Sequence, residues 1–311
     1  MRIVFFGSPQ TALPSLKALL KAGHPIPLII TQPDRPRGRG QSLQPSPVKK
    51  YALHNNIPVY QPRKIREDSK CLEILKDIQP DIHVVVAFGQ IMPSEIIYLP
   101  DYDSINLHFS FLPKYRGASP VQWAVLKGET QTGITIFRLN EKMDQGDILA
   151  RKKVPIQPEE NAAQLEERLA EKGADFLVET LSQIKTIQLA PQDHSQATYA
   201  PLIKKKDGKI DWEKDAPSIH NQVRAFFSWP SSFSFFHEKR IKIIQTKNLN
   251  QKTEKSAAPG EITHIDERGI TVCCGQNTLL LIEKLQPENK KVMSAYSFSL
   301  GARIKAGDRF Q

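Results

Sequence analysis

Residues 81–89, DIHVVVAFG, form a nearly continuous apolar run that ends in a glycine. An apolar run of this kind is typical of a strand buried on both faces, as in parallel sheets that are covered by helices on each side. Residues 2–7 (RIVFFG) and 25–31 (PIPLIIT) are similar, and helix-like stretches occupy residues 11–23 and 68–78. This alternation predicts a doubly wound α/β domain with a mostly parallel, Rossmann-like sheet.

Two further helices are predicted, one from an N-cap sequence and the other from the spacing of its leucines. Ser46 followed by Pro47 is typical of a helix N-cap and the first helical position. In residues 161–184 leucines recur at spacings of four and eight, which predicts an amphipathic helix packed on the sheet. The first strand leads into FFGSPQ, which has a single glycine and not the GxGxxG pattern, so we expect no dinucleotide.

The composition and the hydrophobic pattern of the chain change beyond residue 189. Residues 190–208 are polar and show no helical period, so they are predicted to link an N-terminal domain, residues 1–189, to a second domain, residues 209–311. In the second domain, short β-type runs are separated by turn-like segments. This pattern predicts a small C-terminal β-barrel with OB-like topology.

The charge of the chain is uneven. The net charge is +10, and residues 201–311 hold 19 Lys and Arg against 12 Asp and Glu, whereas the first 200 residues hold 24 against 21. A basic C-terminal third is typical of a protein with a polyanionic partner such as nucleic acid, and an ordinary basic surface is equally compatible with it. No run of about 18 apolar residues is present, so we expect no membrane span.

The cysteines and the first residues bear on the cellular compartment. Cys71, Cys273 and Cys274 are odd in number and two are adjacent, which argues against a disulfide framework. No CxxC or Cys/His spacing indicates a zinc site, so no metal is expected. The N-terminal MRIVFFGSP enters a strand directly and has no cleavage-site context, so no signal peptide is expected. These features predict reduced thiols in a cytoplasmic protein.

The stretch INLHFSFLPKYRG (residues 105–117) places polar side chains inside a buried-strand pattern. Because side chains alternate along a strand, Asn106 and His108 should share one face and Ile105 and Leu107 the packed face. Ligands of open α/β sheets bind at the carboxyl ends of the strands, where this pair falls. An amide and a titratable ring there suit carbonyl polarisation and proton transfer, although two satisfied buried polar residues would give the same pattern.

A glycine-containing loop after the strand-like residues 133–139 adds carboxylates. NEKMDQGDIL (residues 140–149) contains Asp144 and Asp147, and a carboxylate near His108 would orient its ring. On its own, an acidic loop of this kind is more often a solvated turn.

Together these residues resemble a known family. INLHFSFLPKYRGASPVQWAVLKGETQTGITIFRLNEKMDQGDIL is similar to the signature region of the formyltransferases that use 10-formyltetrahydrofolate. The resemblance extends through FFGSPQTALPSLKALL, TQPDRPRGRGQ, VVVAFGQIMP and TYAPLIKKKDGKIDW to the C-terminal barrel. The arginine-rich loop and the second domain point to members whose acceptor is a tRNA. Phe109, Phe111 and Gln145 depart from the family pattern, and the two aromatics would alter the shape of the folate pocket.

The resemblance implies a reaction and a catalytic set. The formyl group of the co-substrate 10-formyltetrahydrofolate would pass to the free amino group of methionyl initiator tRNA, for translation initiation. Asn106 would donate to the formyl oxygen, His108 would stabilise the oxyanion and protonate the leaving nitrogen, and Asp144 would hold His108 in its useful state. The enzyme would need no metal or membrane and would be a cytoplasmic monomer.

The resemblance also implies two sets of binding residues. The folate is expected at loops that follow strands, on Phe88, Gly89, Gln90, Ile91, Ser110, Phe111, Leu112, Pro113 and Met143. The tRNA is expected on cationic segments, on Arg35, Arg37, Arg39, Lys204, Lys205 and Lys206. For the apolar residues ordinary core packing is an alternative, and for the lysines a solvated linker is one. Arg39, between two glycines, is the expected key contact, because its planar fork suits a phosphate or a base.

Two other functions are compatible with parts of this pattern. A formyltransferase acting on a small amine or a nucleotide sugar would need the same catalytic residues but no arginine-rich loop at residues 34–41. A catalytically silent RNA-binding protein would use the basic barrel, but the presence of Asn106, His108 and Asp144 together argues against it.

Overall fold

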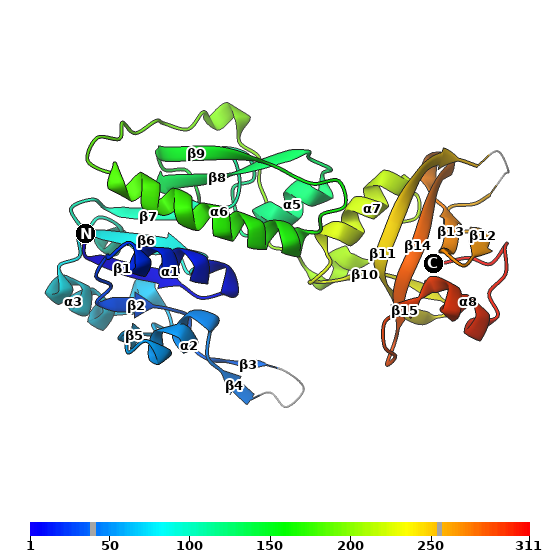
Figure 1. Ribbon diagram of the computed structural model, residues 1–311, viewed down its shortest axis with the longest axis horizontal. Coiled ribbons are helices and arrows are strands. Elements are labelled where there is room, and N and C mark those ends of the chain that lie inside the picture. Colours follow the sequence, from blue (N-terminus) through cyan, green and yellow to red (C-terminus); the bar gives the residue numbers. More distant parts are fainter. Residues whose placement is uncertain (38–41, 254–256) are drawn as a thin grey trace. The chain divides into compact units, whose positions relative to one another are not determined.

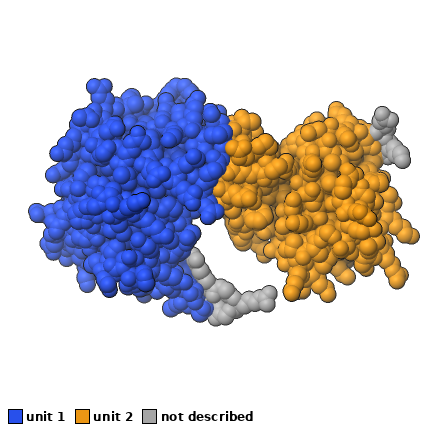
Figure 2. All heavy atoms as spheres, in the orientation of Figure 1, with its two compact units in different colours: residues 1–120, 131–155, 166–200 blue, residues 121–130, 156–165, 201–311 orange. Residues whose placement is uncertain are grey.

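The computed structural model describes residues 1–37, 42–253 and 257–311, and the chain separates into two compact units (Figure 2). Unit 1 comprises residues 1–120, 131–155 and 166–200, and unit 2 comprises residues 121–130, 156–165 and 201–311. Residues 190–200, the first part of the polar segment that the sequence suggests as a linker, therefore lie in unit 1.

Unit 1 is built on a seven-stranded sheet (Figure 1). In spatial order its strands are β5 (Val59–Tyr60), β2 (Leu28–Ile30), β1 (Ile3–Gly7), β6 (Ile82–Val86), β7 (Ser104–His108), β8 (Gln131–Arg138) and β9 (Ile148–Pro155). The first five strands are parallel, and β8 and β9 run antiparallel to their neighbours. Every residue of β1 and β6 is buried, as expected for central strands covered on both faces.

Helices cover both faces of this sheet. The helices along this part of the chain are α1 (Leu13–Lys21), α2 (Pro47–His54), α3 (Ser69–Ile78), α4 (Ser94–Ile97) and α6 (Ala162–Ser182), whereas α5 (Pro120–Leu126) belongs to unit 2 except for its first residue. Helices α3 and α4 pack on the face that carries Phe6 and Val85. On the other face α6 approaches β7 so closely that a Cβ on Gly173 would lie 3.1 Å from Leu107. The predicted cap of α2 is confirmed, since the Ser46 side chain accepts the Lys49 N–H at 3.0 Å.

Between β2 and α2 the chain forms a short hairpin that the sequence did not predict. Its strands are β3 (Arg35–Arg37) and β4 (Ser42–Gln44), which pair antiparallel. The prolines in this stretch argue against a helix, and they are compatible with edge strands, since in the described part of the chain β3 and β4 pair only with each other. The hairpin belongs to unit 1.

Unit 2 contains an antiparallel sheet in the order β10-β11-β14-β13-β12, with β15 beside β14. The elements are α7 (Ala216–Ala225), β10 (Ser232–Phe236), β11 (Lys239–Lys252), β12 (Ile262–Asp266), β13 (Gly269–Cys273), β14 (Thr278–Pro287), β15 (Met293–Ser294) and α8 (Ala295–Ala302). Gln311 exchanges two backbone hydrogen bonds of 2.9 Å with Phe235 of β10, while the Phe310 N–H donates to Gly260, just before β12. The last residues thus bridge the two edges of the sheet, which closes it like a barrel. The predicted fold class is confirmed.

Two further observations concern the helices and the thiols. Within residues 1–37, 42–253 and 257–311, every helix is too short or too polar to span a lipid bilayer. Cys71, Cys273 and Cys274 are free and buried. Burial raises the pKa of the Cys71 thiol to about 12, so this cysteine is not a ready nucleophile.

Candidate active site

Asn106 and His108 lie at the carboxyl end of β7. In the sheet register Asn106 pairs with Val85 of β6, and His108 pairs with Thr135 of β8. Both polar side chains therefore face the side of the sheet opposite to Leu107, as the alternation along the strand requires. Asn106 is half-buried, and its amide has no hydrogen-bond partner among the residues described. This amide is available to a ligand.

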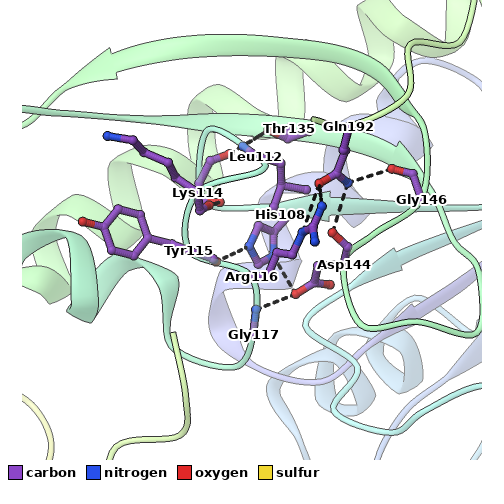
Figure 3. A network of polar contacts seen from close by, with 11 residues as sticks. His108, Leu112, Lys114, Tyr115, Arg116, Gly117, Thr135, Asp144, Gly146 and Gln192 are labelled. Carbon is purple, nitrogen blue, oxygen red and sulfur yellow. Dashed lines mark hydrogen bonds and ion pairs between the residues drawn. The ribbon is translucent and has the colours of Figure 1, made fainter. Parts of the chain in front are cut away.

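The His108 ring is held between a carbonyl and a carboxylate (Figure 3). Its Nε2 lies 3.0 Å from the Tyr115 carbonyl oxygen. Because a carbonyl can only accept, Nε2 carries the hydrogen and donates it. The Nδ1 atom lies 3.9 Å from Asp144 Oδ2, and the two side chains are 9% and 15% exposed. It follows that Nδ1 is the ring atom that can gain or lose a proton without breaking the bond to Tyr115.

The carboxylate of Asp144 is fixed by the turn that also holds the histidine. Asp144 lies in the loop between β8 and β9 with a φ of 52°, and its Oδ2 accepts the Gly117 N–H at 2.7 Å. Gly117 has a φ of 122°, and a Cβ there would lie 2.7 Å from the Ala200 carbonyl oxygen. The second aspartate of the loop, Asp147, is exposed. The structure thus brings Asp144, and not Asp147, to His108.

The turn from Ser110 to Pro113 is tied to the neighbouring strand. The Thr135 hydroxyl donates to the Ser110 carbonyl at 2.7 Å and accepts the Leu112 N–H at 3.1 Å. Ser110 and Leu112 are buried, whereas Phe111 is half-buried beneath the Arg151 guanidinium, 4.5 Å from its ring centroid. The departure from the family pattern at Phe111 therefore places an aromatic ring against a cation.

The loop after β6 offers unpaired backbone groups. Among the residues described, the N–H groups of Gly89, Gln90 and Ile91 donate to no protein acceptor. The Gln90 side chain is engaged elsewhere, since its Oε1 accepts the Ile65 N–H at 2.7 Å. Phe88 is buried. A planar ligand with polar edges could be recognised by these backbone groups.

Two apolar side chains predicted to meet the folate are open to solvent. Ile91 is 53% exposed and Met143 is 59% exposed. Large apolar side chains at this level of exposure beside a polar site are typical of a ligand-binding rim.

No group of three or more His, Cys, Asp or Glu side chains that could hold a metal ion occurs within residues 1–37, 42–253 and 257–311.

The cationic residues fall on both units. Arg35, in β3, is exposed and donates to the Gln32 side chain at 2.9 Å, and Gln32 in turn donates to the Phe88 carbonyl at 3.0 Å. The base of the hairpin is therefore tied to the loop after β6. Arg37 is the last residue of β3, and Arg39 lies outside the described residues. In unit 2 the three predicted lysines, Lys204, Lys205 and Lys206, are all exposed.

The structure adds two side chains that the sequence analysis did not select. Arg116, in the basic end of the signature stretch, is 2% exposed, and Gln192, in the polar segment after α6, is 6% exposed. Figure 3 shows them in the polar network with Asp144. Neither has a sequence signal of its own, because an arginine two residues after a lysine and a glutamine in a polar segment normally indicate surface.

Comparison with known proteins shows the family of this chain. The family model described as formyl transferase matches residues 1–181, and the model described as formyl transferase, C-terminal domain, matches residues 202–303. A methionyl-tRNA formyltransferase of Sulfurihydrogenibium sp. (strain YO3AOP1) is 44% identical over 318 residues, covering 100% of both chains. One from Thermodesulfovibrio yellowstonii is 44% identical over 306 residues, covering 98% of this chain and 97% of the relative.

A solved structure supports the fold. The N-formyltransferase from Helicobacter canadensis, in complex with folinic acid and dTDP-3-aminofucose, superposes with a TM-score of 0.69. The match covers 92% of this chain and 99% of that chain at 21% identity, so it bears on the architecture alone.

Proposed function

This chain belongs to the formyl transferase family, and we propose that it transfers the formyl group of 10-formyltetrahydrofolate to the free amino group of methionyl initiator tRNA. The product would be formylmethionyl-tRNA for translation initiation. The observation that carries this proposal is the full-length identity of 41–44% to methionyl-tRNA formyltransferases, in a chain that brings His108 beside Asp144 at a strand end. We further propose that the protein acts as a monomer in the cytoplasm.

The reaction is an acyl transfer, and we assign its steps to three side chains. The neutral amine of the methionyl group attacks the formyl carbon, and the electron pair of the carbonyl π bond moves to its oxygen. Asn106, whose amide is unpaired within the described structure, donates to that oxygen. The attacking nitrogen releases a proton, which His108 takes at Nδ1. The resulting imidazolium lies between the Tyr115 carbonyl and the Asp144 carboxylate.

Collapse of the tetrahedral intermediate completes the transfer. The bond between the former formyl carbon and N10 of the folate breaks, and its electron pair passes to N10. The proton held at His108 Nδ1 moves to N10, which leaves as a neutral secondary amine, and the electron pair of the oxyanion re-forms the carbonyl. The ring returns to its starting state with Nε2–H still donating to Tyr115. Asp144 acts by orienting the ring, since its own carboxylate is held by Gly117.

We propose that the folate binds between the loop at residues 88–91 and the turn at residues 110–113, with Met143 beside it. The free backbone N–H groups at residues 89–91 support this position, because they can hydrogen-bond to the polar edge of the pterin. The exposed Ile91 and Met143 side chains would cover its apolar faces. Leu112 is fully buried, so its part would be to support the turn from beneath.

For the tRNA, we propose contacts on the β3–β4 hairpin and on the lysines of unit 2. The hairpin carries Arg35 and Arg37, and Arg39 follows in the sequence. Its base is linked through Gln32 to the proposed folate loop, which supports a role close to the reacting amine. Lys204, Lys205 and Lys206 are exposed cations that could meet phosphates of the tRNA.

Presenting two kinds of acceptor tests the proposal directly. The purified chain is incubated with 10-formyltetrahydrofolate and, in parallel reactions, with methionyl initiator tRNA or with a dTDP-linked amino sugar. Mass spectrometry then identifies which amine has gained a formyl group. We expect formylation of the charged tRNA alone. Formylation of the amino sugar at an equal or higher rate would instead support the small-acceptor alternative.

A further inference from the structure

The buried guanidinium of Arg116 is bound to an amide. Nε and Nη2 donate to Gln192 Oε1 at 3.1 and 2.7 Å, and Nη2 also donates to His194 Nδ1 at 2.9 Å. Within the described residues Arg116 forms no ion pair with a carboxylate. Because a cation this far from water needs strong acceptors, the Gln192 oxygen is an essential partner.

The NH₂ group of the same amide binds the loop that contains Asp144. Gln192 Nε2 donates to the Asp144 carbonyl at 3.0 Å and to the Gly146 carbonyl at 2.7 Å (Figure 3). The orientation of the amide is therefore chemically fixed. A flipped amide would point its NH₂ at the guanidinium and its oxygen at two carbonyls, so that every contact would be repulsive.

The backbone of residues 144–146, which Gln192 binds, can shift very little. Asp144 has the left-handed backbone conformation that side chains other than glycine adopt rarely. At Gly146 an added Cβ would lie 1.7 Å from the Arg138 carbonyl oxygen, so the loop runs directly against β8. The direction of the Asp144 side chain toward His108 depends on this backbone, and the backbone depends on the donors of Gln192.

We propose that Gln192, oriented by the buried Arg116, is a positioning residue for Asp144 in formyl transfer. The inference rests on the proposed function, because the role of Asp144 is part of it. The segment after α6 would then be a component of the catalytic machinery of unit 1, although it touches no reacting atom. Gln192 acts by keeping the Asp144 carboxylate on Gly117 and His108.

Replacing Gln192 by glutamate isolates the contribution of the two donors. Gln192→Glu keeps the length of the side chain and an oxygen for Arg116, but it turns a second oxygen toward the Asp144 and Gly146 carbonyls. We expect kcat for tRNA formylation to fall about 10- to 100-fold, the scale of a small misplacement of a catalytic group, with KM for both substrates within about twofold. The matched control is Gln188→Glu, the same change at an exposed glutamine four residues away. It should leave kcat unchanged.

A double substitution separates positioning from mere packing. In the background of Asp144→Ala, Gln192→Glu should lower kcat by less than about twofold, because the group that it positions is already gone. An equal loss in both backgrounds would overturn the proposal, and so would a kcat for Gln192→Glu within twofold of the unaltered protein. If Gln192→Glu fails to fold in a thermal melt, Gln192→Met, which has similar length and no charge, is put through the same comparison.

A readout other than activity makes the inference separable from the proposed function. The Gly117 N–H donates to Asp144, so its hydrogen exchange reports whether the carboxylate stays in place. We expect faster exchange at Gly117 in Gln192→Glu and an unchanged rate in Gln188→Glu. If the unaltered protein formylates no tRNA, the proposed function fails while this exchange result still stands. Unchanged exchange at Gly117 in an active protein would refute the positioning role.

Discussion

Replacing His108 by glutamine separates the structural part of this residue from its chemical part. The His108 ring donates its Nε2–H to the Tyr115 carbonyl oxygen at 3.0 Å, so Nδ1 is the atom left to exchange a proton. A glutamine can place an amide N–H where Nε2–H stands, but it has nothing that titrates at the position of Nδ1. An alanine loses both. His108→Gln should therefore keep the fold and lose the chemistry, whereas His108→Ala should also weaken the fold.

The structure sets the size of both effects. Loss of general acid–base catalysis should lower kcat about 10²- to 10⁴-fold in either variant. In His108→Ala the Tyr115 carbonyl also loses its donor in a site where the His108 side chain was 9% exposed, so the free energy of unfolding should fall by about 1–3 kcal/mol. Single-turnover formylation and urea unfolding measure the two quantities. If His108→Gln formylates within tenfold of the unaltered protein, a proton at Nδ1 is not needed and the assignment is wrong.

Three other perturbations test separate parts of the argument. Asn106→Ala should lower kcat about 10²- to 10³-fold in the formylation assay with folate binding unchanged, because it removes the donor to the oxyanion. Burial lowers the pKa of His83 to about 3, so between pH 6.5 and 3 only the unfolded chain takes up this proton. Urea unfolding should therefore show the free energy of unfolding falling by up to about 1.4 kcal/mol per pH unit as the pH drops. His83→Leu removes the titrating ring and should reduce that slope, while Ser104 keeps the Ile97 carbonyl as its acceptor. Ser46→Ala should cost about 1 kcal/mol in the same measurement by uncapping α2.

The parts of the fold that sequence predicts well are those fixed by periodicity. The apolar runs at β1 and β6, the cap at Ser46 and the leucine spacing of α6 each need only neighbours along the chain. The face shared by Asn106 and His108 follows from strand alternation in the same way. The β3–β4 hairpin has no such pattern, because its strands are only three residues long and β3 contains a proline.

The supporting residues of the site were beyond prediction for a different physical reason. Arg116 and Gln192 are polar side chains whose burial depends on partners 76 positions apart in the sequence. A local pattern predicts burial only for apolar residues, since a polar residue is buried solely where another segment supplies its hydrogen bonds. The family resemblance supplied the three catalytic assignments, but it carried no statement about the segment that holds them.

Three consecutive residues organise the candidate site. The Tyr115 carbonyl accepts from His108, the Arg116 side chain donates to Gln192, and the Gly117 N–H donates to Asp144. Each contact requires the backbone of this turn to change direction between neighbours, and Tyr115 and Gly117 both have positive φ, of 61° and 122°.

Residues 198–200 lie beside this turn and hold it. The Arg116 N–H donates to the Thr198 carbonyl at 2.8 Å, and the Ala200 N–H donates to the Arg116 carbonyl at 2.7 Å. The same stretch that contains Gln192 therefore fixes both loops of the site, one through an amide side chain and one through backbone pairing. His108 and Asp144 come from different strands, and their mutual position is determined by a segment that follows both. A fragment that ended at residue 189 would keep both residues and lose the contacts that hold them 3.9 Å apart.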